Sequence, residues 1–387
     1  MKKSRHIHLF IIILLFLAAC SPTAGNQEES SIDDLNPKPA AETADPEVKV
    51  EENPTGITLT DASGNELSFT APPERIAIAG RASQMIIHAA YLFPDAVERV
   101  VGMEQRAQRK ISMLPLIDPD FEDKTQFERD AAAEQIAPLQ PDAVLMKTYM
   151  AERLGGPLGQ LNIPVVYLDL ETPEQFLRDV GSLGDLFDNP ERAEQIESFY
   201  KDRMQRVESA LQGLKPEEQP GVLLLQYDSR SGDAAFNVPP ESWLQTQMVE
   251  LAGGVPVWLE ASEAGGWTVV NFEQIAAWDP DMIFVVNYFD DPDPVVADLR
   301  QDPKWAALRA VQTEKIFAFP GDFSSWDQPD TRWIMGLQWL AAAIHPEEFE
   351  SLDLLNEVKT FYEELYRMDA GTFEEQVLPL ITGDFDL

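Results

Sequence analysis

The chain has 387 residues, of which 67 are acidic and 29 are lysine or arginine, and its formal net charge is −38. Such a surface repels nucleic acid and anionic lipid headgroups, which disfavours both as direct partners. A single cysteine, Cys20, also excludes an internal disulfide, an iron–sulfur cluster and a cysteine-based zinc site. An anionic ligand would therefore need a locally basic pocket to overcome the overall field.

The first residues predict the compartment. A basic start is followed by an apolar run over residues 9–17, which is too short to span a bilayer as a permanent helix. The sequence Leu-Ala-Ala-Cys that ends at Cys20 resembles a bacterial lipobox. We expect residues 1–19 to be a lipoprotein signal peptide and Cys20 to be the lipidated N-terminus of the mature protein. Residues 20–54 contain almost no large apolar side chains, which predicts a disordered tether.

Strands alternate with helices over the next part of the chain, which predicts an α/β lobe over residues 55–171. An alternating pattern over residues 56–70 indicates a β-hairpin that turns at Gly64. Buried strands then follow at residues 75–79, 99–102, 143–146 and 164–168, with a helix over residues 83–93.

Helical patterns replace this alternation over residues 172–214. Pro173 begins one helix, and Asn189 with Pro190 supplies the cap and first position of a longer one. We interpret the longer helix as a connector. The remaining residues, 215–387, predict a second α/β lobe, with strands at 221–226 and 315–319 and helices at 241–251, 329–344 and 352–368.

A twelve-residue pattern occurs once in each predicted lobe. Residues 134–145 read EQIAPLQPDAVL, and residues 273–284 read EQIAAWDPDMIF. Each copy indicates a short helix, a Pro-Asp turn and a buried strand. The repeat suggests two similar lobes, and such proteins usually work in the cleft between them.

The chain resembles the substrate-binding lipoproteins of ABC importers that carry iron–siderophore complexes, haem or cobalamin. The resemblance covers residues 56–349 and rests on the opening ITLTDASGNELSFTAPPERIAIAG, the two repeats, and the segments WAALRAVQTEKIF and WLAAAIHPE. It implies an α/β fold of two Rossmann-like lobes with mainly parallel sheets, joined by one long helix. It also implies a monomer without cofactor, anchored by lipid on the outer side of the cytoplasmic membrane, whose partners are an ABC permease and its ATPase.

In the family, one glutamate on each lobe docks into arginines of the permease, and Glu134 and Glu273 match those positions. A first-turn glutamate also complements a helix dipole, so both roles are open.

Ligands of open α/β sheets bind beyond the carboxyl ends of the strands, and this rule selects polar and aromatic residues in the loops that follow them. In the family, hydroxamate-siderophore binders present an arginine and a tyrosine from the loops that hold Arg106 and Tyr149. The expected ligand-binding residues are Arg81, Ser83, Arg106, Tyr149, Tyr227, Trp267, Tyr288, Trp326 and Arg332. Trp333, Trp339, His88 and His345 are expected to be structural.

No G-x-S-x-G elbow, phosphate-binding P-loop or His/Glu metal spacing occurs in the sequence, so we predict neither catalysis nor a metal site. Ferric siderophore is the first candidate ligand. Cobalamin, haem and molybdate or tungstate stay open, whereas a bare transition-metal ion is disfavoured by the lack of histidine and cysteine in the cleft loops. A lipid-anchored hydrolase and a sensor lipoprotein without a permease are the alternatives from other classes.

Overall fold

The computed structural model describes residues 56–104, 111–230, 232 and 234–385. The predictions for the signal peptide, Cys20, the tether and Arg106 lie outside these residues. The chain divides into two units, and the fold described below is that of Glu52–Leu387.

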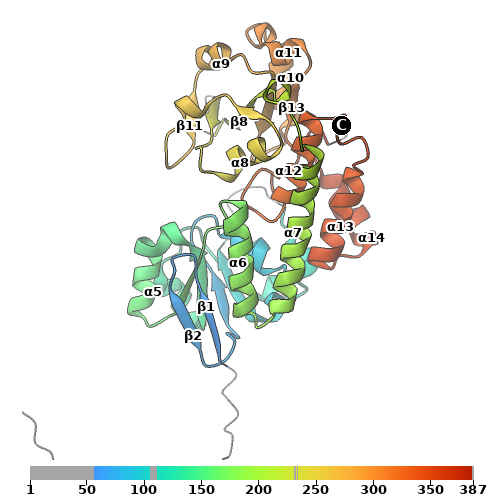
Figure 1. The fold of residues 1–387 in the computed structure, drawn as a ribbon. Helices are drawn as coiled ribbons and strands as arrows, with labels where there is room; N and C mark the ends of the chain where they lie inside the picture. The colour runs from blue at the N-terminus through green and yellow to red at the C-terminus, as the bar shows by residue number, and fades with distance from the viewer. Residues whose placement is uncertain (1–55, 105–110, 231, 233, 386–387) are drawn as a thin grey trace, which may run out of the picture. The chain divides into compact units, whose positions relative to one another are not determined.

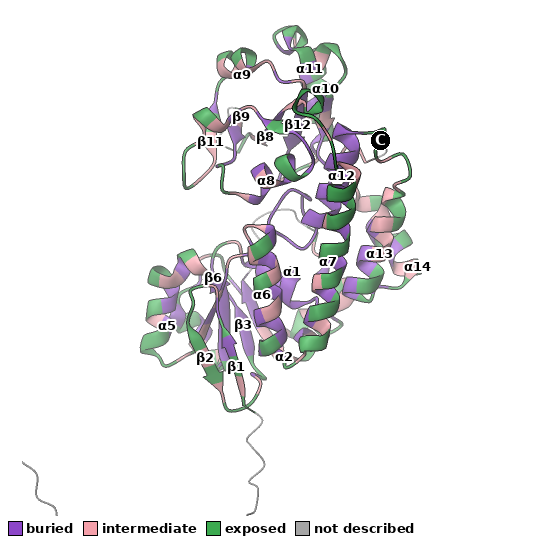
Figure 2. Ribbon diagram, viewed as in Figure 1, coloured by how far each residue is buried: buried purple, intermediate pink, exposed green. Residues whose placement is uncertain are grey.

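The first lobe is built on a five-stranded sheet of order β5-β4-β3-β6-β7, in which every pair is parallel. The central strands are buried on both faces, as Figure 2 shows for β3 and β6. The strands are β3 (Ile76–Ile78), β4 (Val100–Glu104), β5 (Thr125–Phe127), β6 (Ala143–Lys147) and β7 (Val165–Leu168). The helices are α1 (Ser83–Ala90), α2 (Ala96–Arg99), α3 (Leu114–Ile117), α4 (Ala133–Ile136) and α5 (Gly156–Gln160).

The predicted hairpin is present ahead of this sheet as β1 (Ile57–Thr60) and β2 (Glu66–Phe69). The Asp61 carboxylate accepts the backbone N–H groups of Ser63 and Asn65, each at 2.9 Å, and Gly64 provides the positive φ of +78° that the turn needs.

Two helices connect the lobes, and the longer one has the Asn189 cap expected from the sequence. The Thr172 hydroxyl caps α6 (Pro173–Leu186), and the Asn189 side chain caps α7 (Pro190–Ala210) by accepting from the backbone of Arg192 at 3.2 Å. α7 packs against α6 and against α12 (Trp333–Ile344) of the second lobe (Figure 1).

The second sheet has the order β11-β9-β8-β12-β13, with β10 beside β8. Its centre is parallel, but β9 and β11 add antiparallel pairs at one edge. The strands are β8 (Gly221–Asp228), β9 (Ala235–Val238), β10 (Val255–Pro256), β11 (Thr268–Val270), β12 (Met282–Val286) and β13 (Ile316–Ala318). The helices are α8 (Leu244–Leu251), α9 (Phe272–Trp278), α10 (Asp293–Gln301), α11 (Arg309–Gln312), α12, α13 (Leu354–Tyr366) and α14 (Ala370–Thr372).

The predicted fold class is therefore confirmed: two α/β lobes with mainly parallel sheets are joined by a long helix. Trp333 and Trp339 lie in the core with 0% exposure, as expected. The sequence reasoning missed β5, β9, β10 and β11, each of four residues or fewer.

The repeated pattern occupies equivalent places in the two lobes. Its strand is β6 beside β3 in the first lobe and β12 beside β8 in the second. The isoleucine of each copy, Ile136 or Ile275, is 0% exposed. The seventh residue of each copy, Gln140 or Asp279, ends its helix in the left-handed region, with φ of +49° and +41°.

The aspartate that follows the proline in each copy bonds to the backbone at the start of the neighbouring strand. The Asp142 carboxylate accepts the backbone N–H groups of Glu74 and Arg75, at 3.0 and 2.9 Å, just before β3. The Asp281 carboxylate accepts the N–H of Gly221, the first residue of β8, at 2.8 Å. Each Pro-Asp turn thus sets where the adjacent parallel strand begins.

A buried ionic network, which we call the interlobe clasp, joins α1 of the first lobe to the loop before α12. Its members are His88, Asp322, Asp330 and Arg332. The Arg332 guanidinium lies 2.6 Å from Asp322 and 2.8 Å from Asp330, and all three side chains are 0% exposed. His88, 2% exposed, hydrogen-bonds to Asp330. Burial alone would raise the pKa of Asp330, but the charges of His88 and Arg332 lower that pKa below its ordinary value.

Tyrosines from other elements complete the clasp. The Tyr362 hydroxyl donates to Asp322 at 2.5 Å, and the Tyr366 hydroxyl donates to the His88 carbonyl at 3.1 Å, both from α13. Tyr200 of α7 donates to the Thr331 carbonyl. α12 begins at Trp333 rather than at the predicted Pro329 because residues 330–332 form the turn that carries the clasp.

We predict that Arg332→Met lowers the free energy of unfolding by about 3–5 kcal/mol, because it removes a buried guanidinium that pairs with two buried carboxylates. Arg309→Met is the matched control, since Arg309 also pairs two aspartates, Asp279 and Asp281, but its side chain is 53% exposed. That change should leave the free energy of unfolding nearly unchanged, because ion pairs exposed to water contribute little. Urea unfolding of both variants tests the prediction, and equal losses would contradict it.

Candidate ligand-binding site

The carboxyl ends of three strands in the first lobe bring three arginines to one carboxylate. Arg81 follows β3, Arg129 follows β5, and Arg153 lies in the helical turn Ala151–Gly155 that comes after β6. Their guanidinium groups lie 3.2, 4.0 and 3.0 Å from the carboxylate of Asp130. We call these four residues the arginine cluster.

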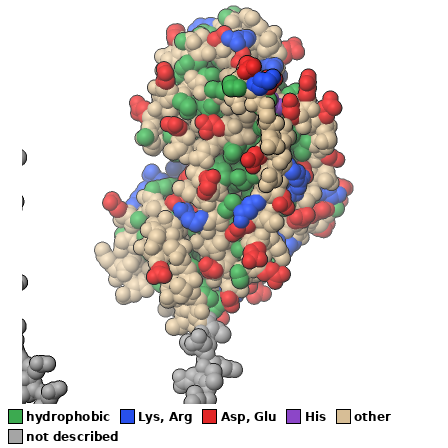
Figure 3. Space-filling view, viewed as in Figure 1, with side chains coloured by type: hydrophobic (Ala, Val, Ile, Leu, Met, Phe, Trp, Pro, Cys, Tyr) green, Lys and Arg blue, Asp and Glu red, His purple; other side chains and the backbone are tan. Residues whose placement is uncertain are grey.

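The cluster is exposed and carries an excess of positive charge. The side chains of Arg81, Arg129 and Arg153 are 54, 63 and 50% exposed, whereas Asp130 is 31% exposed. The hydrogen bond from Arg81 and the charges of all three arginines lower the pKa of Asp130, so the carboxylate is ionised. Even with the nearby Glu104 counted, three cations face two anions. Figure 3 shows lysine and arginine side chains gathered at the hollow between the lobes.

A buried glutamate holds the loops of the cluster together. Glu104, the last residue of β4, is 4% exposed. Its carboxylate accepts the backbone N–H of Gly80 at 2.6 Å and that of Asp130 at 2.9 Å. Gly80 has a φ of +91°, which allows the chain to turn sharply between β3 and Arg81. The loops that follow β3 and β5 are therefore tied to one carboxylate at the end of β4.

Two other predicted residues of the first lobe lie beside the cluster. Tyr149 is 59% exposed, and its hydroxyl donates to the Arg81 carbonyl at 3.0 Å, which places an accessible aromatic ring next to the cluster. Ser83 is buried at the start of α1, where its backbone N–H bonds to the Gly80 carbonyl at 3.3 Å. Ser83 thus supports the turn that presents Arg81.

The predicted aromatic residues of the second lobe are largely engaged with each other. Tyr288 is 8% exposed and donates to Asp327 at 2.6 Å, and burial together with Asp327 raises its pKa well above the ordinary value. The partly buried Trp267 packs edge-on against Trp243 and Tyr288, with ring centres 5.6 and 5.9 Å away.

Tyr227 lines a separate cavity of about 640 Å³ in the second lobe. Here the Arg230 guanidinium lies 3.7 Å from the centre of the Phe289 ring and pairs with Asp228 at 2.5 Å. The other charged residues that line this cavity are Asp290, Asp291, Asp298 and Asp302. Its charge is negative, opposite to that of the arginine cluster.

Trp326 and Arg332 were expected to contact ligand, and the structure corrects both. Each is 0% exposed. The Trp326 indole N–H donates to Asp322 at 3.1 Å, its ring packs edge-on against Phe385, and Arg332 belongs to the interlobe clasp. The polar composition of residues 321–332 suggested an exposed loop, but these polar side chains bond to one another inside the protein.

Arg129 and Arg153 were missed by the sequence analysis. Arg129 follows a strand of three residues that carries no clear pattern, and Arg153 lies six positions beyond β6. The signal that could have found them is their positive charge, since the chain has 29 lysines and arginines against 67 acidic residues.

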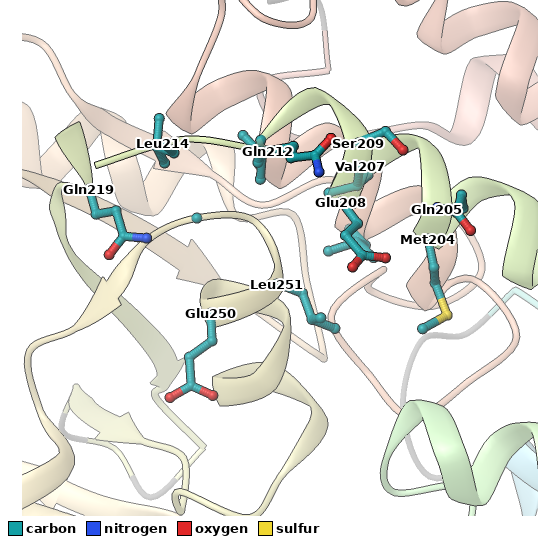
Figure 4. A pocket seen from close by; sticks show the side chains of 13 residues that line it. Met204, Gln205, Val207, Glu208, Ser209, Gln212, Leu214, Gln219, Glu250 and Leu251 are labelled. Carbon is teal, nitrogen blue, oxygen red and sulfur yellow. The ribbon is translucent and has the colours of Figure 1, made fainter. Parts of the chain in front are cut away.

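A second cavity, of about 420 Å³, lies where the end of α7 meets α8 (Figure 4). Glu208 and Glu250 contribute its carboxylates, and no described residue that lines it is basic. It does not suit an anion.

Within the described residues, no group of three or more histidine, cysteine, aspartate or glutamate side chains is arranged to hold a metal ion. In the same part of the chain, no helix combines the length and apolarity needed to cross a membrane.

The family model described as periplasmic binding protein matches residues 113–323. The chain belongs to this family. Its members are extracytoplasmic substrate-binding proteins of ABC transporters rather than enzymes, and they bind small-molecule ligands.

Individual relatives agree with the assignment. The chain is 26% identical over 297 residues to the molybdate-binding protein MolA of Haemophilus influenzae. The match covers 70% of this chain and 81% of that protein. A periplasmic solute binding protein of Veillonella parvula superposes with a TM-score of 0.67 at 26% identity, over 83% of this chain and 97% of that one. Helicobacter pylori CeuE, in complex with Ni-His, has the same fold, with a TM-score of 0.66 at 17% identity over 83% of this chain and 99% of that one.

We predict that Glu104→Gln speeds amide hydrogen exchange at Gly80 and Asp130 by about tenfold or more, because a hydrogen bond to a charged acceptor contributes about 1.5–3 kcal/mol. The control is Asp142→Asn, which removes the charged acceptor of Glu74 and Arg75 at the other end of the same sheet. Unchanged exchange at Gly80 and Asp130 in the first variant would show that Glu104 does not hold the loops.

Proposed function

We propose that this binding protein captures an anionic metal chelate, with ferric siderophore as the first candidate, and delivers it to an ABC permease. The observation that carries the proposal is the arginine cluster at the carboxyl edge of the first sheet, in a chain of net charge −38. Guanidinium groups bind paired oxygens in a fork geometry, and carboxylate, hydroxamate and catecholate chelators present such oxygens.

The dimensions of the cluster favour a chelate over a small ion. Its arginines come from three loops and each is at least half exposed, so together they present donors over a wide surface. Tyr149 adds an accessible aromatic face beside them. A ligand with several oxygen arms and an organic frame would use both features.

Molybdate or tungstate is the second candidate, and the relationship to MolA favours it. A tetrahedral oxyanion presents the same kind of oxygen to a guanidinium group, but one such ion would occupy only part of the cluster. Cobalamin and haem are further alternatives that a ligand panel must include.

We further propose that Cys20 carries the lipid anchor and that Glu134 and Glu273 dock to the permease. Both glutamates are exposed, and neither carboxylate has a hydrogen bond or ion pair within the described residues. The helix caps are supplied by the next residue in each repeat: Gln135 accepts the N–H of Ala132 at 2.8 Å, and Gln274 accepts that of Asn271 at 3.0 Å. The glutamates are thus available for a partner.

Thermal-shift measurements on the folded unit Glu52–Leu387 test the ligand. We expect a ferric chelate with anionic arms to raise the melting temperature, since a ligand at 100 times its Kd adds about 2.7 kcal/mol. The panel contains ferric hydroxamate, catecholate and carboxylate chelates, molybdate, tungstate, haem and cobalamin.

Arg153→Met should remove the thermal shift, and Arg309→Met, at an exposed arginine outside the cluster, should keep it. A panel in which no anionic metal complex moves the melting temperature would contradict the proposed function.

Changing both Glu134 and Glu273 to Ala should abolish ligand uptake by cells while leaving the Kd for ligand unchanged, because both side chains point outward and bond to nothing else described. Glu122→Ala with Glu347→Ala, two other exposed glutamates, is the control pair and should retain uptake. Normal uptake by cells that carry both Glu134→Ala and Glu273→Ala would contradict the docking role.

A further inference from the structure

We infer that Asp130 is a specificity-determining residue, an internal carboxylate that competes with simple anions for the arginine cluster and disfavours them relative to anions with several oxygens. The inference rests on the proposed function, because it requires the cluster to bind an anionic ligand.

The position of the Asp130 carboxylate is that of a bound anion. One oxygen, Oδ1, lies 3.2 Å from Nε of Arg81 and 3.0 Å from Nη2 of Arg153, and the other oxygen lies 4.0 Å from Nε of Arg129. Two guanidinium groups from separate loops therefore converge on a single oxygen. An incoming ligand oxygen would take the same donors.

The backbone of Asp130 is held so that its side chain reaches this position. Its N–H is bonded to the buried Glu104 at 2.9 Å, and its φ of +63° lies in the left-handed region. A non-glycine residue adopts that conformation at an energetic cost, which the bond to Glu104 offsets. Asp130 is thus held at its backbone by Glu104 and at its carboxylate by the three arginines.

An internal carboxylate changes which anions the cluster accepts. A simple anion needs the position that the Asp130 carboxylate occupies, so its apparent affinity is multiplied by the fraction of time that this position is free. A ligand with several oxygens can also bind the exposed nitrogens of the three arginines while Asp130 stays in place. Its affinity is therefore reduced less than that of a simple anion. Asp130 therefore favours multidentate ligands over the sulfate and phosphate of the external medium.

A purely structural Asp130 would behave differently. If its only role were to hold three like charges together, its removal would let the arginines separate and would weaken the binding of all anions. The two roles therefore predict opposite changes in affinity.

The test compares wild-type protein with Asp130→Asn, using calorimetric titration of the folded unit Glu52–Leu387 with sulfate, molybdate and a ferric triscatecholate. If Asp130 occupies the cluster about nine-tenths of the time, the variant should bind sulfate and molybdate about tenfold more tightly. The ratio of the Kd for sulfate to the Kd for the chelate should therefore decrease. Asp228→Asn, in the exposed pair with Arg230 of the second lobe, is the control and should change neither quantity.

The outcomes separate the two proposals. Suppose that the wild type binds the chelate and that Arg153→Met abolishes this binding. If Asp130→Asn then leaves the affinity for every anion unchanged or lower, the role of Asp130 is overturned while the proposed function stands. If neither the wild type nor a folded Asp130→Asn protein binds any of the three anions, both proposals are overturned. Tighter binding of simple anions by Asp130→Asn, with its melting temperature retained, supports the inference.

Discussion

The folded unit depends on the Arg332 guanidinium being enclosed between Asp322 and Asp330. These charges have no access to water, so each is stable only while its partners stay in place. Because His88 comes from the first lobe and Tyr362 from the C-terminal region, the network can form only when the lobes, the connecting helix and α13 are assembled together. The network thereby ties α1 of the first lobe to the loop before α12 of the second.

The charge of the lining residues distinguishes the candidate binding regions of the molecule. The protein repels anions over most of its surface, and the cavities beside Tyr227 and at the end of α7 are lined by carboxylates. Among the described residues, the arginine cluster instead presents three cations around one carboxylate. Its arginines are presented from the ends of parallel strands, where the topology of an open α/β sheet leaves loops free to meet a ligand.

Local features of the fold were predictable, and tertiary pairings were not. The hairpin turn, the caps at Thr172 and Asn189, and the two repeats follow from short-range hydrogen bonding and periodicity, so the lobes and their connector could be predicted from the sequence. The clasp could not, because Arg332 and its two aspartates are enclosed by His88 and Tyr362, which lie far from them in the chain. For the same reason Trp326 was placed in a ligand loop, and Arg129 was overlooked after a strand of three residues. Arg81 and Tyr149 lie together in loops at the strand ends, as the topological rule predicts, and their contact with ligand stays a prediction.

The most direct test of the central claim is anomalous diffraction at the metal absorption edge from crystals of the protein with its bound metal complex. The account predicts one strong peak in the cleft at the carboxyl edge of the first sheet, with ligand oxygens within hydrogen-bond distance of Arg81 and Arg153. A peak in the acidic cavity beside Tyr227, or at the end of α7, would contradict it.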